Sequence, residues 1–223
     1  MLETILHWDT VVTLFLNGLR APWLDPVMYW ISNKFVWGPL YIFVFFVVVK
    51  KWKKKSIILV PLLILAVTIS DQSCNLLKKS TKRLRPSHNI ELEHKIHLVK
   101  QPDGKFYRGG KYSFPSAHAA NAMVFALFVF FFAGNKKMWV LLAVFFWAAL
   151  LGYSRIYLGV HYWLDVEFGY LVGVLSFTLV FGAYKLCGSL CLLRALCAEK
   201  TIQHGDIKDT KFYGDIKTLN QKI

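Results

Sequence analysis

Charged side chains, and acidic ones above all, are scarce in this sequence. Only 18% of its 223 residues are charged, and 13 acidic residues stand against 27 basic ones. Hydrophobic residues make up 56% of the chain, and 16% of all residues are aromatic. This composition is too apolar for a typical soluble domain, and the chain is too short for two large domains. We therefore expect a single integral membrane domain.

Cysteine is also rare, and several metal motifs are missing. The sequence has four cysteines, without a Cys-x-x-Cys pair or a disulfide framework. It has no His-Glu-x-x-His motif, no clustered carboxylates and no Cys/His spacing of a zinc site. We therefore interpret the cysteines as apolar packing residues and expect no metal site.

Long apolar stretches occupy most of the chain. A helix needs about 20 apolar residues to cross a bilayer, and helices satisfy their own backbone in lipid. We therefore expect an all-α fold, a polytopic membrane helix bundle of five or six spans. Five spans are predicted over residues 35–49, 56–77, 115–133, 138–153 and 163–184. A sixth through residues 4–19 is the alternative to N-terminal helices that lie along the membrane interface.

The predicted organisation has three parts. Residues 1–34 form the interfacial helices, residues 35–198 the membrane domain with an outer loop over 78–114, and residues 199–223 a polar cytoplasmic tail. The short basic run over residues 50–55 places its end of the bundle in the cytoplasm by the positive-inside rule. No basic start followed by an apolar core and a small-residue cleavage site is present, so we expect no cleaved signal peptide.

Three segments with candidate functional residues meet at the opposite membrane surface if the chain has five spans. They read KKSTKRLRP (residues 78–86), FPSAHAAN (114–121) and SRIYLGVHYWLD (154–165). Arginine side chains, a helix N-terminus and two histidines together favour a phosphate site. His161 and Asp165 are four residues apart, so on a helix the carboxylate can hold one imidazole nitrogen and leave the other free.

The net charge of +14 raises the question of a nucleic-acid partner. Its basic residues are dispersed among the predicted spans, whereas nucleic-acid binding concentrates them in a basic patch. We therefore expect a phosphorylated membrane lipid as the anionic partner, and no nucleic acid.

In order and spacing, the three segments resemble the signature of the type 2 phosphatidic acid phosphatase superfamily of membrane lipid phosphatases. That signature is Lys, six residues, Arg-Pro; then Pro-Ser-Gly-His; then Ser-Arg, five residues, His, three residues, Asp. The sequence matches it except that Ala117 replaces the glycine, which alanine can do if its φ is negative. The resemblance covers residues 56–184.

The resemblance implies a role for each matching residue. His161 is expected to be the nucleophile that forms a phosphohistidine, Asp165 to orient it, and His118 to act as general acid and then base. The residues expected to bind the phosphoryl oxygens are Lys78, Arg85, Ser116, Ala117 through its backbone, and Arg155. The family uses no metal and no other cofactor.

The substrate is less constrained by the sequence. A compact chain of this kind resembles bacterial envelope phosphatases, which implies the bacterial inner membrane and a site facing the periplasm. The basic loop over residues 87–112 suits a multiply charged head group, so lipid A (lipopolysaccharide) phosphate is the first expectation. Undecaprenyl diphosphate and phosphatidylglycerol phosphate are alternatives. An anion transporter is the non-enzymatic alternative, although the internal repeats typical of transporters are missing.

Three further polar residues are candidates for other roles. We expect Asp71, inside the second span, to tie its helix to neighbouring helices through hydrogen bonds, together with Gln72 and Asn75. Asn121, three residues after His118, is a candidate to face the pocket. Glu167 is on a different helix face from Asp165 and is expected to be an interfacial charge.

Overall fold

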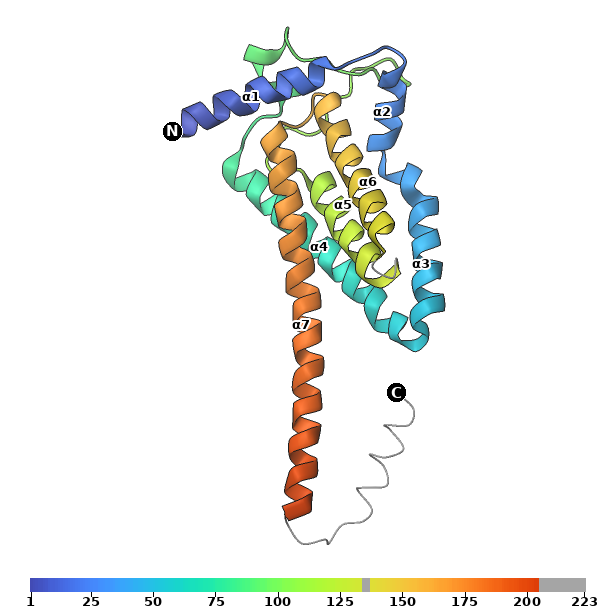
Figure 1. Ribbon diagram of the computed structural model, residues 1–223. Helices are drawn as coiled ribbons and strands as arrows, with labels where there is room; N and C mark the ends of the chain where they lie inside the picture. The colour runs from blue at the N-terminus through green and yellow to red at the C-terminus, as the bar shows by residue number, and fades with distance from the viewer. Residues whose placement is uncertain (134–136, 205–223) are drawn as a thin grey trace. The chain divides into compact units, whose positions relative to one another are not determined.

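The computed structural model describes the backbone of residues 1–133 and 137–204, and the side chains of this part up to residue 187 (Figure 1). The described part is helical, with two isolated β-bridges in the loop between α4 and α5, which confirms the predicted all-α class. Its helices are α1 (Leu2–Gly18), α2 (Leu24–Ser32), α3 (Gly38–Trp52), α4 (Ser56–Thr81), α5 (Ala117–Phe128, continued by a π-helical turn over Val129–Ala133), α6 (Met138–Tyr157) and α7 (Trp163–His204).

Three helical segments are long and apolar enough to cross a membrane. They are Lys34–Thr81, Met138–Tyr157 and Trp163–Cys187, with Ala117–Ala133 as a shorter apolar helix. The first segment holds both α3 and α4, and after a basic turn at Lys53–Lys55 the chain returns in α4, which diverges from α3 (Figure 1). The polytopic bundle is therefore as expected, and the number of crossings stays a prediction.

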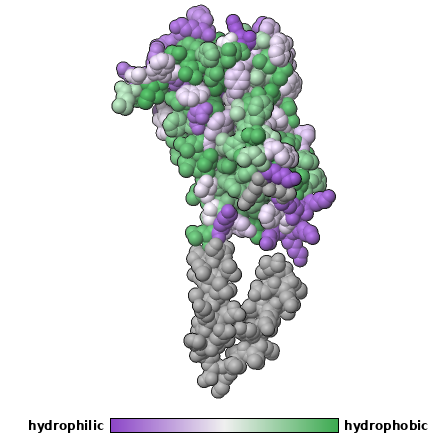
Figure 2. Space-filling view, viewed as in Figure 1, coloured by the Kyte–Doolittle hydropathy of each residue, from purple (hydrophilic) through white to green (hydrophobic). Residues whose placement is uncertain are grey.

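Apolar side chains cover much of the flank of the bundle, while charged residues gather at its ends (Figure 2). Large exposed hydrophobic residues include Phe43 and Phe46 on α3, Ile57 on α4 and Phe146 on α6. In water such a surface would be an association site, whereas in a bilayer it faces lipid at no cost. The exposed apolar flank therefore suits a helix bundle surrounded by lipid.

Small residues allow α5 to lie close to α7 and α4. Five alanines of α5 are buried, and glycines of α7 face the same helix. A Cβ atom added to Gly169 would lie 2.5 Å from the Ser116 carbonyl oxygen, closer than a real contact permits. Close backbone approach through small residues is a common way to pack membrane helices. This approach holds the start of α5 against the start of α7.

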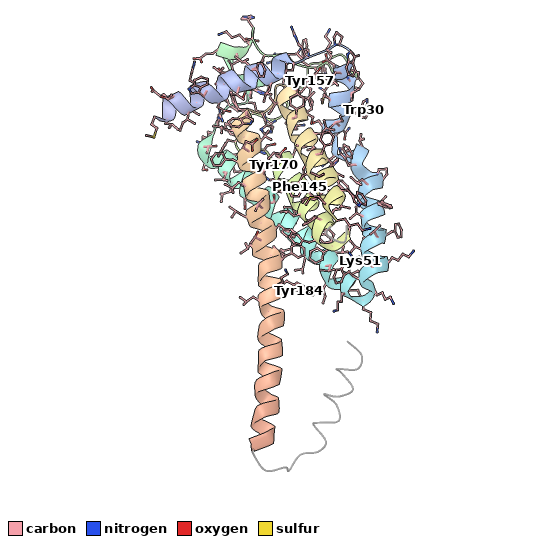
Figure 3. The ribbon with its side chains drawn as sticks, in the orientation of Figure 1. Trp30, Lys51, Phe145, Tyr157, Tyr170 and Tyr184 are labelled. Carbon is pink, nitrogen blue, oxygen red and sulfur yellow. The ribbon has the colours of Figure 1, made fainter. Side chains whose placement is uncertain are left out.

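Tyrosines fasten α6 to its neighbours. Tyr170 of α7 donates a hydrogen bond of 2.9 Å to the Ala148 carbonyl in the middle of α6 (Figure 3). At the end of α6, the Tyr157 hydroxyl donates to the Asp25 carboxylate of α2 at 2.6 Å. Helix α6 is therefore held at its middle by α7 and at its end by α2.

Helix α1 turns three of its polar residues inward. Asp9, Thr13 and Asn17 are at most 1% exposed, whereas Trp8 is 62% exposed. Asn17 donates to the Ile156 and Tyr157 carbonyls at the end of α6, at 3.1 and 2.9 Å, and Asp9 and Thr13 accept hydrogen bonds from the start of α7. An outward apolar face suits a helix with lipid on its outer side. The domain boundary at residue 34 stays a prediction.

Two helices are longer than the sequence indicates. Helix α4 continues without a break past the polar stretch at residues 70–75, and within it Asp71 accepts a hydrogen bond from Asn75 at 3.0 Å. That bond lies along α4 itself, and the expected bonds from Asp71, Gln72 and Asn75 to neighbouring helices stay a prediction. Helix α6 runs to Tyr157, so Ser154 and Arg155 lie in its last turn and not in the connecting turn.

Candidate active site

A cavity of about 720 Å³ opens between α3, α4 and α5. One end is polar and is lined by Lys78, Arg85, His118 and His161, which come from all three signature segments. The rest is lined mainly by apolar side chains such as Val48, Leu63 and Phe125. The cavity therefore joins a cationic end to an apolar end, as an amphiphile with an anionic head group requires.

His161 and Asp165 form a buried pair at the polar end. His161 is 1% exposed and lies two residues before the start of α7, while Asp165 is fully buried in its first turn. His161 Nδ1 lies 3.4 Å from Asp165 Oδ2, a long hydrogen bond of the kind that often tightens when substrate binds. Because Asp165 faces Nδ1, the opposite ring nitrogen, Nε2, is left for chemistry.

The surroundings of His161 keep its ring neutral. Burial lowers the pKa of His161 well below its usual value of 6.5, and the cations Arg85 and Arg155 lower it further. A neutral imidazole has the lone pair that a nucleophile needs. Several positive charges next to a neutral histidine form a site that is poised for an anion.

Arg83 lies beside the His–Asp pair but was not predicted from the sequence as a site residue. Its guanidinium donates to Asp165 Oδ1 at 2.9 Å and to Asp9 Oδ2 of α1 at 2.6 Å. It also stacks over Tyr162, with its central carbon 3.8 Å from the ring centre. The acidic residue Asp9 within an apolar stretch was the available signal, since a buried acid needs a partner. Arg83 therefore links α1 to the carboxylate beside His161.

Asp165 has further partners besides Arg83 and His161. Its Oδ2 accepts a hydrogen bond from the backbone N–H of Tyr162 at 2.9 Å, and its backbone carbonyl accepts one from Ser116 N–H at 2.8 Å. The first bond holds the carboxylate at the start of α7. The second joins α7 to the start of α5, where His118 lies.

Arg85 and Arg155 are both buried, but they differ in their partners. Arg85 donates to the carbonyls of Tyr112 and Val160 at 3.0 and 3.2 Å. Burial, followed by the charge of Arg155, lowers its pKa to about 10, which leaves it protonated at neutral pH. Arg155 donates to the hydroxyls of Ser32 and Tyr107, and its Nε has no partner among the described residues. Arg155 is not among the residues that line the cavity, and its role in phosphate binding stays a prediction.

The start of α5 has the expected form. Ser116 is the N-cap residue, and its hydroxyl accepts a hydrogen bond from the Ala119 N–H at 3.5 Å. Ala117 is the first helical residue and does not have the positive φ that would strain an alanine. The replacement of glycine is therefore tolerated here. Ala117 and His118 line the cavity, whereas Ser116 is fully buried and is not among the lining residues.

The loop over residues 87–112 is only in part the free basic surface that was expected. His97 lies 3.1 Å from the Asp25 carboxylate and 2.9 Å from Arg20, and its N–H donates to Asn17. Arg108 lies 3.9 Å from Glu93. His97 thus fastens the loop to α1 and α2. Among the residues that the structure describes, no three His, Cys, Asp or Glu side chains gather as a metal site requires.

Apolar helices, a buried His–Asp pair and clustered cations above an apolar cavity define a membrane enzyme that acts on a phosphorylated lipid. The family model of the PAP2 superfamily matches residues 57–188, so the chain belongs to this superfamily of membrane phosphatases. The chain is 39% identical to a lipid A 4'-phosphatase of Porphyromonas gingivalis, over 82% of this chain and 75% of that protein. It is 34% identical to a lipid A 4'-phosphatase of Bacteroides thetaiotaomicron, over 85% of this chain and 83% of that protein.

A solved structure shows the same fold. It is a transmembrane PAP2-type phosphatidylglycerolphosphate phosphatase from Bacillus subtilis, with a TM-score of 0.61 and 25% identity. The match covers 82% of this chain and 87% of that one. This chain is therefore a bacterial membrane protein and a lipid phosphatase of the PAP2 superfamily.

Proposed function

We propose that this enzyme removes a phosphate group from lipid A through a phosphohistidine intermediate. The observation that carries the proposal is the cavity, which joins His161 and the cationic side chains near it to an apolar end. Two relatives that cover most of the chain are lipid A 4'-phosphatases, which favours this lipid over the alternatives. Undecaprenyl diphosphate and phosphatidylglycerol phosphate are the alternative substrates, the second because of the Bacillus subtilis structure.

The first step is attack of His161 Nε2 on phosphorus. The P–N bond forms as the bond to the sugar oxygen breaks, and His118 gives a proton to that leaving oxygen. Asp165 holds the proton on Nδ1 and offsets the positive charge that develops on the ring. Lys78, Arg85 and Arg155 stabilise the phosphoryl oxygens in the transition state.

The second step is hydrolysis of the phosphohistidine. His118, now without its proton, takes a proton from water as the water oxygen attacks phosphorus. The P–N bond breaks, inorganic phosphate leaves, and His161 returns to its neutral state. The role assigned to Ser116 is to hold the start of α5 and, with the backbone N–H at Ala117, to shape the phosphate site.

The proposed setting is the bacterial inner membrane, with the site facing the periplasm. The basic turn at residues 50–55 supports a cytoplasmic position for the other end of the bundle. In this scheme residues 1–34 lie along the membrane interface, residues 35–198 form the catalytic domain and residues 199–223 are a cytoplasmic tail.

The test is phosphate release by the purified chain from lipid A, undecaprenyl diphosphate and phosphatidylglycerol phosphate, assayed side by side. We expect the highest kcat/KM on lipid A, and no turnover on any of the three by His161→Ala. Alkaline quenching with labelled substrate should trap acid-labile, base-stable phosphate on the wild type and not on this variant. Turnover by His161→Ala would refute the mechanism, and a preference for another lipid would refute only the substrate.

A further inference from the structure

The cavity contains a polar region between its cationic and apolar ends. Asp71 and Asn75 of α4 and Asn121 of α5 all line it, and we call these three residues the middle subsite. Asp71, Asn75 and Lys78 are spaced at successive turns of one helix face, as are His118 and Asn121 on α5. Along each helix, the middle subsite thus lies about one to two turns, roughly 5–10 Å, from the side chains at the cationic end, toward the apolar end of the cavity.

The hydrogen bonding of the middle subsite is incomplete within the protein. The Oδ1 atom of Asn121 is buried and accepts no hydrogen bond from any residue that the structure describes. Asp71 accepts one bond, from Asn75 at 3.0 Å, although a carboxyl group can accept several. Buried acceptors without a donor are costly and rare, and polar side chains inside membrane segments are mostly functional. The Asn121 Oδ1 atom and the Asp71 carboxylate can therefore accept further hydrogen bonds from donors of a bound molecule.

We propose that the middle subsite binds hydroxyl or amide N–H groups of the substrate, between its phosphate and its acyl chains. The inference rests on the proposed function and makes it more specific. An acylated amino sugar such as lipid A has amide N–H and hydroxyl donors at this distance from a ring phosphate. A polyprenyl diphosphate has none beyond its phosphate groups. The subsite therefore selects donor-bearing lipids, because a donor-free lipid leaves its acceptors unpaired.

Two lipids that differ in their hydrogen-bond donors test this selectivity. Ceramide 1-phosphate and phosphatidic acid of the same chain lengths are both two-chain phosphate monoesters. Only the first has an amide N–H on the carbon next to the phosphate-bearing carbon and a hydroxyl one carbon further on. The experiment measures kcat/KM of the full-length protein on both probes and on lipid A in mixed micelles.

Asn121→Ala is the principal variant, because the Asn121 oxygen has no described partner whose bond would be lost. Asp71→Asn is the second variant and keeps the shape of the side chain. Thr68→Val is the matched control, since Thr68 lines the same cavity but already donates to the Ile64 carbonyl at 2.8 Å. Elution as a single peak in detergent shows that each variant is folded.

We expect the wild type to favour ceramide 1-phosphate over phosphatidic acid. Asn121→Ala should lower kcat/KM about tenfold on lipid A and ceramide 1-phosphate, the effect of one lost hydrogen bond, and less than about threefold on phosphatidic acid. Asp71→Asn should act in the same direction, and Thr68→Val should change no value by more than about twofold.

Equal losses on all three lipids would show a structural role for Asn121 and overturn the inference. Unchanged selectivity in both Asn121→Ala and Asp71→Asn would also overturn it, while the phosphatase assignment would stand. A wild type that releases no phosphate from any of the lipids would instead overturn the proposed function, and the subsite with it.

Discussion

At the scale of single residues, the carboxylate of Asp165 combines several tasks. It faces His161 Nδ1, accepts a backbone hydrogen bond from Tyr162 and pairs with Arg83. Asp165→Asn keeps the shape but removes the charge and turns an N–H₂ group toward one of these donors. By analogy with orienting carboxylates in other enzymes, we expect kcat to fall by about 10²–10⁴-fold with a much smaller change in KM.

Glu167→Gln is the control for Asp165→Asn. Glu167 is exposed and does not line the cavity, so steady-state kinetics should show nearly wild-type values. A more damaged enzyme in Glu167→Gln than in Asp165→Asn would mean that His161 is paired with a different carboxylate.

The charges around His161 predict a pH dependence. The pKa of His161 is lowered by burial and then by the positive charges of Arg85, Arg155, Lys78 and Arg83. The reactive neutral ring therefore persists below pH 6.5 and is lost only as the pH falls through the lowered pKa. The acid limb of kcat/KM should therefore lie below pH 6.5. Arg155→Gln removes one cation and should move this limb to higher pH. Since the titration of the substrate phosphate is the same for both enzymes, an unshifted limb would exclude His161 as the titrating group.

At the scale of helices, α1 contributes to the site without reaching it. Asp9 accepts hydrogen bonds from Arg83 and from the Leu164 backbone at 2.6 and 2.8 Å, so it fixes both the arginine and the first turn of α7. Arg83→Gln and Asp9→Asn should lower kcat about 10–100-fold, by loosening the Asp165 position, with little effect on KM. Arg83→Lys should restore part of kcat, because a positive charge returns. A fall in protein yield alone, with normal kcat, would show that Arg83 is only structural.

The close crossing of α5 and α7 makes a second prediction at this scale. Gly169→Ala places a methyl group against the Ser116 carbonyl, so it should destabilise the protein by about 1–3 kcal/mol, the usual cost of overpacking. Gly182→Ala is the control on the same helix, because a Cβ atom there meets nothing within 4 Å. Thermal unfolding in detergent should give a lower Tm for Gly169→Ala only. Equal Tm values would show that the two helices can separate at no cost.

Sequence patterns indicated the helices and the signature residues, because both depend on local spacing. The apolar stretches indicated the positions of α3 to α7. Lys78, Arg85, His118 and His161 line one cavity, as expected if the three signature segments end at the same membrane surface. The contacts of Arg83 were not predictable, because they join residues more than 70 positions apart in the sequence. The buried polar face of α1 was missed for the same reason.

At the scale of the whole molecule, the proposed orientation can be tested with single cysteines. Lys53, in the basic turn, and Lys105, in the outer loop, are both exposed and lie in different connections between helices. With the native cysteines replaced, a membrane-impermeant maleimide should label Lys105→Cys in intact cells whose outer membrane is permeabilised. It should label Lys53→Cys only after the inner membrane is broken, because the positive turn is retained in the cytoplasm. A cysteine-free chain is the control for background. Labelling of Lys53→Cys before lysis, with Lys105→Cys protected, would place the active site on the cytoplasmic side and exclude lipid A in the outer leaflet as its substrate.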